Sequence, residues 1–336
     1  MTEINPDIDL LAPEDVVYLI ECVRRCYGDS YPNPLMYQAD RLKEVINSKL
    51  MHSIIAKHSD GHIIGHCALT FNGQHNTSPE AGKMIVDPDY RGHHIAESMA
   101  KKRIEVARDL NLVGFWTECV TNHSYSQHEM IAFGAKETGL LLGVAPPTIV
   151  MQGLDNFADT RMSLLTMYLP LKETQQTIYI PEIHLEFVAS LTDTLHLNRE
   201  FISSKKIGTG KTEIVIEDNH SVQTANILIH HIGDDFILAI NKTLKSLESL
   251  KPASIYLDLP INQEAAAIAH LHLEGMGFFW GSWIPNYSIQ GDILRLQKIN
   301  QGINSDEIHC ARAEGESIKQ YVLSEWKRVS PNHAEI

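Results

Sequence analysis

The sequence predicts a mixed α/β fold, present as two tandem copies of one architecture. Short apolar runs typical of strands are interspersed with helical-period segments, in the order helix, helix, hairpin, strand, helix, strand, helix, strand, strand. This is a mixed-sheet order and not a doubly wound one. The second half of the chain repeats the end of that order, and 336 residues exceed the size at which single cores stop growing, about 250–300 residues. We therefore expect domains at 1–172 and 173–336, divided at the polar stretch 171–176.

Start and stop signals place the elements of the first half. Pro13 and its acidic neighbours open an apolar helical repeat that Gly28 ends, which predicts a helix over 12–27. Ser59-Asp60-Gly61 between two apolar runs predicts a hairpin. The same reasoning predicts further helices at about 38–49, 95–110 and 124–133, and strands at 53–57, 62–70, 82–86, 113–120, 138–144 and 161–170.

The second half reads in the same way. Its predicted helices lie at about 181–200, 236–247, 263–275 and 305–328, and its strands at 212–217, 225–232, 254–259, 278–284 and 292–299. Element order, more than residue identity, suggests a duplication at roughly half the chain length.

Composition and charge exclude several classes of protein. The net charge is −14, from 28 Lys and Arg against 42 Asp and Glu, so a protein that tracks nucleic-acid phosphates is not expected. An acidic surface favours a cationic partner. No apolar stretch approaches the ~20 residues of a membrane span, and the acidic N-terminus does not resemble a secretory signal. Five scattered cysteines fit a reduced protein. We expect a cytoplasmic chain with no membrane partner.

The most informative stretch runs from Met84 to Ala96, where a strand enters a tight turn containing Gly92 and then a helix. Such a turn leaves several backbone N–H groups unpaired at the positive end of the helix dipole. A phosphate group binds well at such a place even in an acidic protein. Arg91 can add a charge-assisted hydrogen bond.

The sequence Val86-x-Pro88-x-Tyr90-Arg91-Gly92-x-x-Ile95-Ala96 resembles the acetyl-CoA pyrophosphate loop of the GNAT N-acyltransferases, Gln/Arg-x-x-Gly-x-Gly/Ala. Arg91 takes the first position and Ala96 the last, whereas His94 stands where the family has its middle glycine. The resemblance implies that acetyl-CoA, as co-substrate, is bound by Ile85, Val86, Arg91, Gly92, His93, His94, Ile95 and Ala96.

The resemblance extends over roughly residues 10–170. It implies that Asn122, after the next strand, contacts the pantetheine arm, and that two parallel strands separate to admit that arm. It also implies direct transfer, in which a base deprotonates an amine and an acid protonates the CoA thiolate. We assign the base to Glu118 and the acid to Tyr125, each in preference to weaker candidates. The alternatives are His66 and Glu80 for the base, and His128 and Glu129 for the acid.

The second half resembles the family around Asn262 and Gly277-Phe278, but Gly233-Asp234-Asp235 replaces the phosphate turn. Two carboxylates there would repel a pyrophosphate. We therefore expect a GNAT-like domain without a cofactor site, used for the acceptor pocket or an interface. The closely spaced pairs His93-His94, His230-His231 and His270-x-His272 lack His-x-x-x-His helical spacing with an acidic or Cys partner, so no metal is predicted.

The function expected from this resemblance is acetyl transfer from acetyl-CoA to a primary amine of a small molecule or protein. The acidity of the chain favours a cationic amine. The alternative is a non-catalytic acyl-CoA-binding regulatory or interaction protein. A homodimer is left open.

Overall fold

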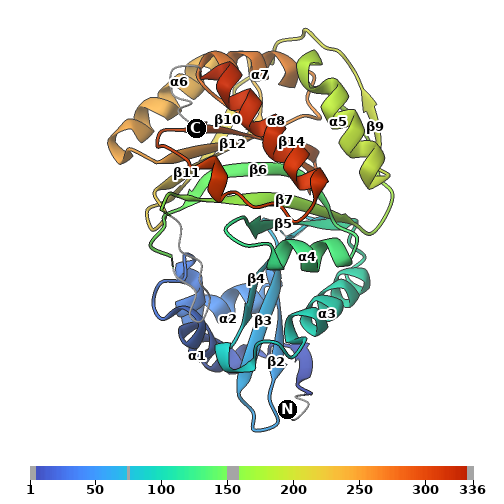
Figure 1. The fold of residues 1–336 in the computed structure, drawn as a ribbon. Helices are drawn as coiled ribbons and strands as arrows, with labels where there is room; N and C mark the ends of the chain where they lie inside the picture. Colours follow the sequence, from blue (N-terminus) through green and yellow to red (C-terminus); the bar gives the residue numbers. More distant parts are fainter. Residues whose placement is uncertain (1–4, 74–75, 150–158, 331–336) are drawn as a thin grey trace. The chain divides into compact units, whose positions relative to one another are not determined.

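The computed structural model describes residues 5–73, 76–149 and 159–330, and Figure 1 shows their fold. These residues form two compact units. One contains residues 5–117 with 148 and 149, and the other contains 118–147 with 159–330. None of the helices in the described ranges has the length and apolarity of a membrane-spanning segment.

The first unit is built on a mostly antiparallel sheet. Strands β1 (Asp7–Leu10), β2 (Met51–Lys57), β3 (Ile63–Thr70) and β4 (Glu80–Val86) pair in chain order. Strand β5 (Gly114–Val120) then pairs with β4 in parallel. The helices are α1 (Val16–Tyr27), α2 (Ala39–Asn47) and α3 (Ile95–Asp109).

Successive side chains of β3 point to opposite faces of the sheet, which explains how helices cover both faces. Ala68 belongs to the core that α1 and α2 form with the sheet. Cys67 points the other way, and its thiol lies 3.7 Å from the carbonyl of Met99 on α3. Gly65 lies on the same face as Cys67, and a Cβ there would come within 2.8 Å of the Met99 side chain. The close packing of α3 on β3 therefore favours glycine at this position, because a larger side chain would displace the end of Met99.

The second unit contains a larger mixed sheet in the order β7-β6-β13-β14-β12-β11-β10. Its strands are β6 (Lys136–Ala145), β7 (Met162–Pro170), β10 (Glu213–Asn219), β11 (Thr224–His231), β12 (Ser254–Pro260), β13 (Phe279–Ser288) and β14 (Gly291–Ile299). A separate parallel pair is formed by β8 (Gln175–Ile178) and β9 (Asn198–Phe201). The helices are α4 (Tyr125–Ala132), α5 (Glu182–Leu195), α6 (Phe236–Leu247), α7 (Ala266–Gly275) and α8 (Ala313–Val329).

The order β4, α3, β5, α4, β6, β7 recurs as β11, α6, β12, α7, β13, β14. The two runs meet where Gly139 of β6 pairs with Ser282 of β13. Both residues follow a left-handed glycine by five positions (Gly134, φ +93°, and Gly277, φ +88°), and both adjoin a bulge. Equivalent positions thus face each other, as two related copies would place them. A Cβ at Gly139 would lie 2.3 Å from the Ser282 Cα, so glycine is required there.

The predicted mixed α/β class is confirmed, with corrections to single elements. The helix predicted over 181–200 ends at Leu195, because His196 is left-handed (φ +53°) and the chain then enters β9. The stretch 171–176, predicted as a connection, already contains the start of β8. The last helix begins at Ala313 instead of 305. The boundaries of the two compact units do not fall at residue 172. The boundary at 172, which separates the two proposed copies of the repeat, stays a prediction.

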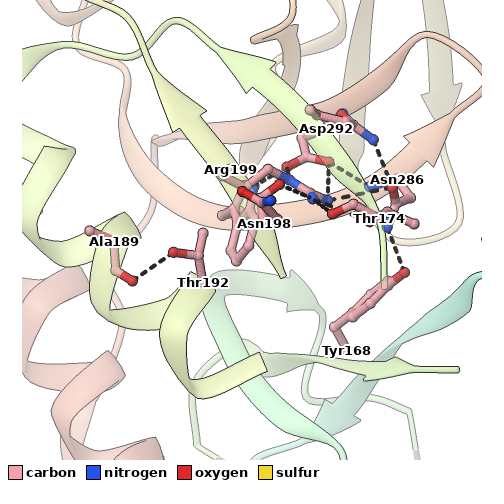
Figure 2. A network of polar contacts seen from close by, with 10 residues as sticks. Tyr168, Thr174, Ala189, Thr192, Asn198, Arg199, Asn286 and Asp292 are labelled. Carbon is pink, nitrogen blue, oxygen red and sulfur yellow. Dashed lines mark hydrogen bonds and ion pairs between the residues drawn. The ribbon is translucent and has the colours of Figure 1, made fainter. Parts of the chain in front are cut away.

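A buried polar network ties β9 to β14 in the second unit (Figure 2). Arg199 donates from Nε and Nη2 to the two carboxylate oxygens of Asp292, at 2.6 and 3.0 Å, and neither side chain is exposed. Asp292 also accepts from the Trp283 indole at 3.0 Å and from the backbone N–H of Asn286 at 2.8 Å. The Asn286 amide donates to the Tyr168 hydroxyl at 2.9 Å. The charge of Asp292 is therefore fully compensated inside the unit.

Candidate functional site

The turn between β4 and α3 has the conformation that the sequence predicts. Asp87 caps a short 3₁₀ helix, Pro88–Tyr90, by accepting from the N–H of Asp89 at 3.2 Å. Gly92 then adopts φ +82° and His94 adopts φ +56°, and α3 begins at Ile95. Two left-handed residues so close together turn the chain sharply from the strand end into the helix.

The backbone N–H groups of residues 92–97 donate no hydrogen bond to any described part of the chain. The N–H groups of residues 95–97 are the unpaired donors of the first helical turn of α3. Those of residues 92–94 belong to the loop that joins β4 to α3. A Cβ at Gly92 would meet no atom within 4 Å, so the space beside this turn is open. Six successive donors beside open space at a helix N-terminus are an arrangement that can bind an anion.

Basic side chains support the turn from the strand side. Arg91 donates from Nε to the carbonyl of Val86 at 3.2 Å, which folds its side chain back over the strand end. Arg25 of α1 pairs with Asp87 and donates to the Ile63 carbonyl at 2.6 Å. Asp87 is thereby neutralised and opposes an incoming anion less.

The other predicted loop residues divide by burial. Ile85 and Ile95 are buried in the core at 3% and 2% exposure, so only their backbones are available to a ligand. Val86, His93 and Ala96 are half-buried. His94 is exposed, and its described polar contact is Glu97 at 3.3 Å.

Replacing His94 by glycine is expected to stabilise the chain by about 0.5–1 kcal/mol, because glycine adopts the left-handed conformation without the Cβ clash. The ion pair that His94 forms with Glu97 is exposed, so its removal has little effect on stability. Urea unfolding measures the change. The control is Glu97→Ala, which removes the same pair and should not stabilise. A His94→Gly variant less stable than wild type would contradict the expectation.

The parallel strand pairs of the two runs, β4 with β5 and β11 with β12, are hydrogen-bonded to different extents. In the described residues, β4 and β5 pair at one register position, Glu80 with Trp116. In the second copy β11 and β12 pair over five positions, from Thr224–Ser254 to Leu228–Asp258. A ligand arm can insert its hydrogen-bonding groups where a parallel pair ends early, and the first copy has this property.

The turn of the second copy is occupied by its own chain. The N–H of Asp234 donates to the Gly210 carbonyl at 3.0 Å, and that of Gly233 donates to the Thr212 hydroxyl at 3.1 Å. A Cβ at Gly233 would lie 2.4 Å from the Gly210 oxygen. Hydrogen bonds from Thr212 also lower the pKa of Asp235, which keeps a negative charge beside the turn. Two amides of this turn are therefore paired within the chain, and the space beside Gly233 is filled, unlike the space beside Gly92.

Glu118, the predicted base, lies in an ion-pair cluster. Its carboxylate accepts from Arg295 at 2.9 Å, and Arg295 also binds Asp258 through two hydrogen bonds of 2.7 and 2.9 Å. Burial opposes the charge of Arg295, but Asp258 and Glu118 outweigh it and raise its pKa. Glu118 and Asp258 are equivalent in the two copies, since each precedes the Asn of its strand end by four residues. To act as a base, Glu118 would have to leave Arg295.

The remaining predicted catalytic residues lie at the start of α4 and in the sheet. Tyr125 is 68% exposed, and its ring centre is 5.0 Å from that of His123. Asn122 is half-buried. Among the alternatives, Glu80 pairs with Lys83 at 3.1 Å. His66 is fully buried, and burial lowers its pKa to about 3, so it is neutral and remote from solvent. His128 is exposed and Glu129 half-buried.

Sequence reasoning missed one buried residue that holds α4 in place next to these side chains. Gln127 is completely buried in α4, donates to the carbonyls of Val120 and His309 at 3.0 and 2.9 Å, and accepts from Ala311 at 2.8 Å. It fixes α4 against the strand end and against residues 309–311. No local signal marks it, because its partners from 309 onward are distant in the sequence.

Comparison with known proteins shows what this geometry resembles. Residues 17–134 match the acetyltransferase (GNAT) family, which confirms the family resemblance for this region. No curated protein sequence matches the chain.

Two of the solved structures that are similar to part of this chain are acetyltransferases. The ribosomal-protein-S18-alanine N-acetyltransferase from Escherichia coli is 14% identical, with a TM-score of 0.39, over 50% of this chain and 95% of its own. Spermidine N-acetyltransferase from Vibrio cholerae, in complex with CoA and spermine, is 16% identical, with a TM-score of 0.37, over 49% of this chain and 94% of its own. Each covers about half of the present chain.

Proposed function

We propose that the protein is an N-acetyltransferase that transfers an acetyl group from acetyl-CoA to a primary amine. The observation that carries the proposal is the run of six unpaired amides beside Gly92, within the region that matches the GNAT family. A pyrophosphate is the part of acetyl-CoA that such a turn would bind. Arg91, His93 and Ala96 border it.

The reaction follows from the chemistry of a thioester and an amine. The amine nitrogen, once it has lost a proton to a base, forms a bond to the acetyl carbon, and the carbon–sulfur bond breaks. The sulfur leaves as the CoA thiolate and takes a proton. Tyr125 is the proposed acid because its hydroxyl is exposed at the start of α4, and Glu118 is the proposed base. Asn122 is the proposed contact of the pantetheine arm.

The second copy, proposed as residues 173–336, has the fold but not the cofactor site, since Gly210 and Thr212 fill its turn. Its proposed role is to complete the acceptor side. Arg295 of that copy already contacts Glu118, so the copy reaches the proposed base directly. The surplus of acidic residues in the whole chain favours a cationic amine as acceptor.

Turnover of an amine panel tests this function. The full chain is incubated with acetyl-CoA and polyamines, amino acids, aminoglycosides and N-terminal peptides, and the free CoA thiol is followed. The proposal predicts thiol release that depends on at least one amine. Cofactor binding without release on any of them would favour the alternative, an acyl-CoA-binding regulatory protein.

The proposed catalytic residues make a separate prediction, on whichever amine is turned over. Tyr125→Phe and Glu118→Gln are each expected to lower kcat by about 10²–10⁴-fold, the usual value of general acid or base catalysis. The matched control is Asp258→Asn, which removes the equivalent carboxylate from the same arginine. If Glu118→Gln and Asp258→Asn lower kcat equally, Glu118 acts through its ion pair and is not the base.

A further inference from the structure

Three helices of the second unit bring together a cluster of buried ligand-type side chains. His184 of α5 and His270 of α7 are completely buried, and their Nε2 atoms lie 3.1 Å apart. Glu274 Oε1 lies 4.0 Å from His184 Nε2, and Glu325 Oε2, on α8, lies 3.8 Å from it. His270 Nε2 and one oxygen of each carboxylate thus lie within 4.0 Å of His184 Nε2, inside the unit.

The imidazole rings of His184 and His270 are not aligned with the line that joins their Nε2 atoms. Their centres are 4.7 Å apart with an interplanar angle of 71°. A straight N–H···N bond would hold the ring centres roughly 5.4 Å apart. Two imidazoles on one tetrahedral ion, with bonds of about 2.0–2.1 Å, place the nitrogens about 3.3 Å apart and the ring centres about 5.2 Å apart. The observed nitrogen separation of 3.1 Å is about 0.2 Å short of the second arrangement, so a small opening of the pair would admit the ion.

The surroundings prepare the histidines as ligands. His184 Nδ1 lies 2.6 Å from the Tyr321 hydroxyl, which leaves Nε2 to face the cluster. Burial lowers the pKa of His184 to about 4 and that of His270 well below its usual value, so both are neutral and can bind a cation through nitrogen. His270 Nδ1 is buried with no hydrogen-bond partner, and its nearest acidic atom is Glu274 Oε1 at 3.9 Å.

We propose that His184, His270 and one of the two carboxylates, Glu274 or Glu325, bind a zinc-type transition-metal ion that ties α5, α7 and α8 together. Imidazole nitrogen with carboxylate oxygen is a ligand set that zinc accepts, and one ligand atom from each of His184, His270 and Glu274 lies within 4.8 Å of the others. The site is independent of acetyl transfer and serves to stabilise the unit.

Arg328 occupies the outer side of the cluster. It pairs with both Glu274 and Glu325, and its side chain is 36% exposed near the end of α8. A metal ion would compete with this guanidinium for the carboxylates, and the partly exposed side chain can turn toward solvent. Removal of Arg328 should therefore strengthen metal binding, whereas removal of a ligand, or of the outer partner Tyr321, should weaken it.

Cobalt titration of the full chain tests the site. The untagged protein is stripped with a chelator and titrated with Co²⁺, whose tetrahedral complexes absorb strongly in visible light, and Zn²⁺ is then added. One equivalent of Co²⁺ is expected to saturate the absorption and one equivalent of Zn²⁺ to abolish it. Binding of zinc should also raise the thermal midpoint of the stripped protein.

Variants locate the site. His270→Ala should weaken binding more than about 100-fold, Tyr321→Phe about 10–100-fold as an outer partner, and Arg328→Met should tighten it. The matched control is His272→Ala, an exposed histidine two residues further along α7, which should bind as wild type does. Glu274→Gln and Glu325→Gln identify the carboxylate ligand.

Two results would overturn the proposal. One is a stripped wild-type protein without a saturable cobalt absorption. The other is an absorption that survives His270→Ala. If His270→Ala does not fold, the wild-type titration and the opposite effects of Tyr321→Phe and Arg328→Met still decide the question.

Discussion

Asp292→Ala is expected to lower the free energy of unfolding by about 3–5 kcal/mol, because it leaves the buried Arg199 guanidinium without its counter-charge. The Trp283 indole and the backbone N–H of Asn286 lose their acceptor in the same step. Urea unfolding followed by tryptophan fluorescence measures the loss.

Two controls separate the charge from the packing. Glu264→Ala removes an exposed ion pair with Lys206 and should cost less than about 1 kcal/mol. The double variant Arg199→Met with Asp292→Leu removes both charges and should cost less than Asp292→Ala alone. A single Asp292→Ala variant as stable as Glu264→Ala would show that the network contributes little.

Acid is expected to destabilise the metal-free protein well before its carboxylates titrate. His66 is neutral in the folded chain, with its pKa lowered by burial to about 3, against the ordinary 6.5 of the unfolded chain. Between these values the unfolded state binds the extra proton, so stability is full above pH 6.5 and falls as the pH decreases toward 3. At pH 5 the loss is about 2 kcal/mol for this histidine. His184, with a pKa of about 4, adds a similar amount.

The contribution of His66 can be measured by itself. Its ring contacts the Ser53 hydroxyl and the Lys83 carbonyl, both at 3.1 Å, and a glutamine can replace these contacts without titrating. His66→Gln should therefore lose about 2 kcal/mol less than wild type between pH 7 and pH 5. His272→Gln, at an exposed position, should lose as much as wild type. Equal losses in wild type and His66→Gln would contradict the assigned state of His66.

Periodicity and turn signals predicted the long elements well, since α3 and β12 follow from local pattern alone. The short strands β8 and β9 could not be found in this way. Each has four residues, and they are defined by parallel pairing with each other and by the contact of Arg199 with Asp292, which is distant in the sequence. The helical signal of 181–195 extended over His196 because one left-handed residue has no effect on apolar spacing.

Local sequence pattern likewise predicted one part of the candidate site and missed another. The turn at Gly92 was predictable because strand, turn and helix are consecutive, and the open amides follow from that local geometry. The ion pair of Glu118 with Arg295 joins residues from both halves of the chain, so no local pattern could reveal it. The same holds for His184 and His270. A His-x-x-x-His pattern does not reveal this cluster, because α7 carries His270 and Glu274 four residues apart and the second histidine comes from α5.

Calorimetric titration of acetyl-CoA into the full chain tests the central claim most directly, with Gly92→Glu and Gly61→Glu as the two variants. Both glycines have positive φ and open space, so the two substitutions impose similar strain and the same charge, but Gly61 lies at the tip of the β2–β3 hairpin. Wild type and Gly61→Glu should bind at roughly 10–50 µM or tighter, and Gly92→Glu should bind at least about 100-fold more weakly. A wild-type protein that does not bind in that range, or a Gly92→Glu variant that binds equally well, would contradict the assignment of the turn as the cofactor site.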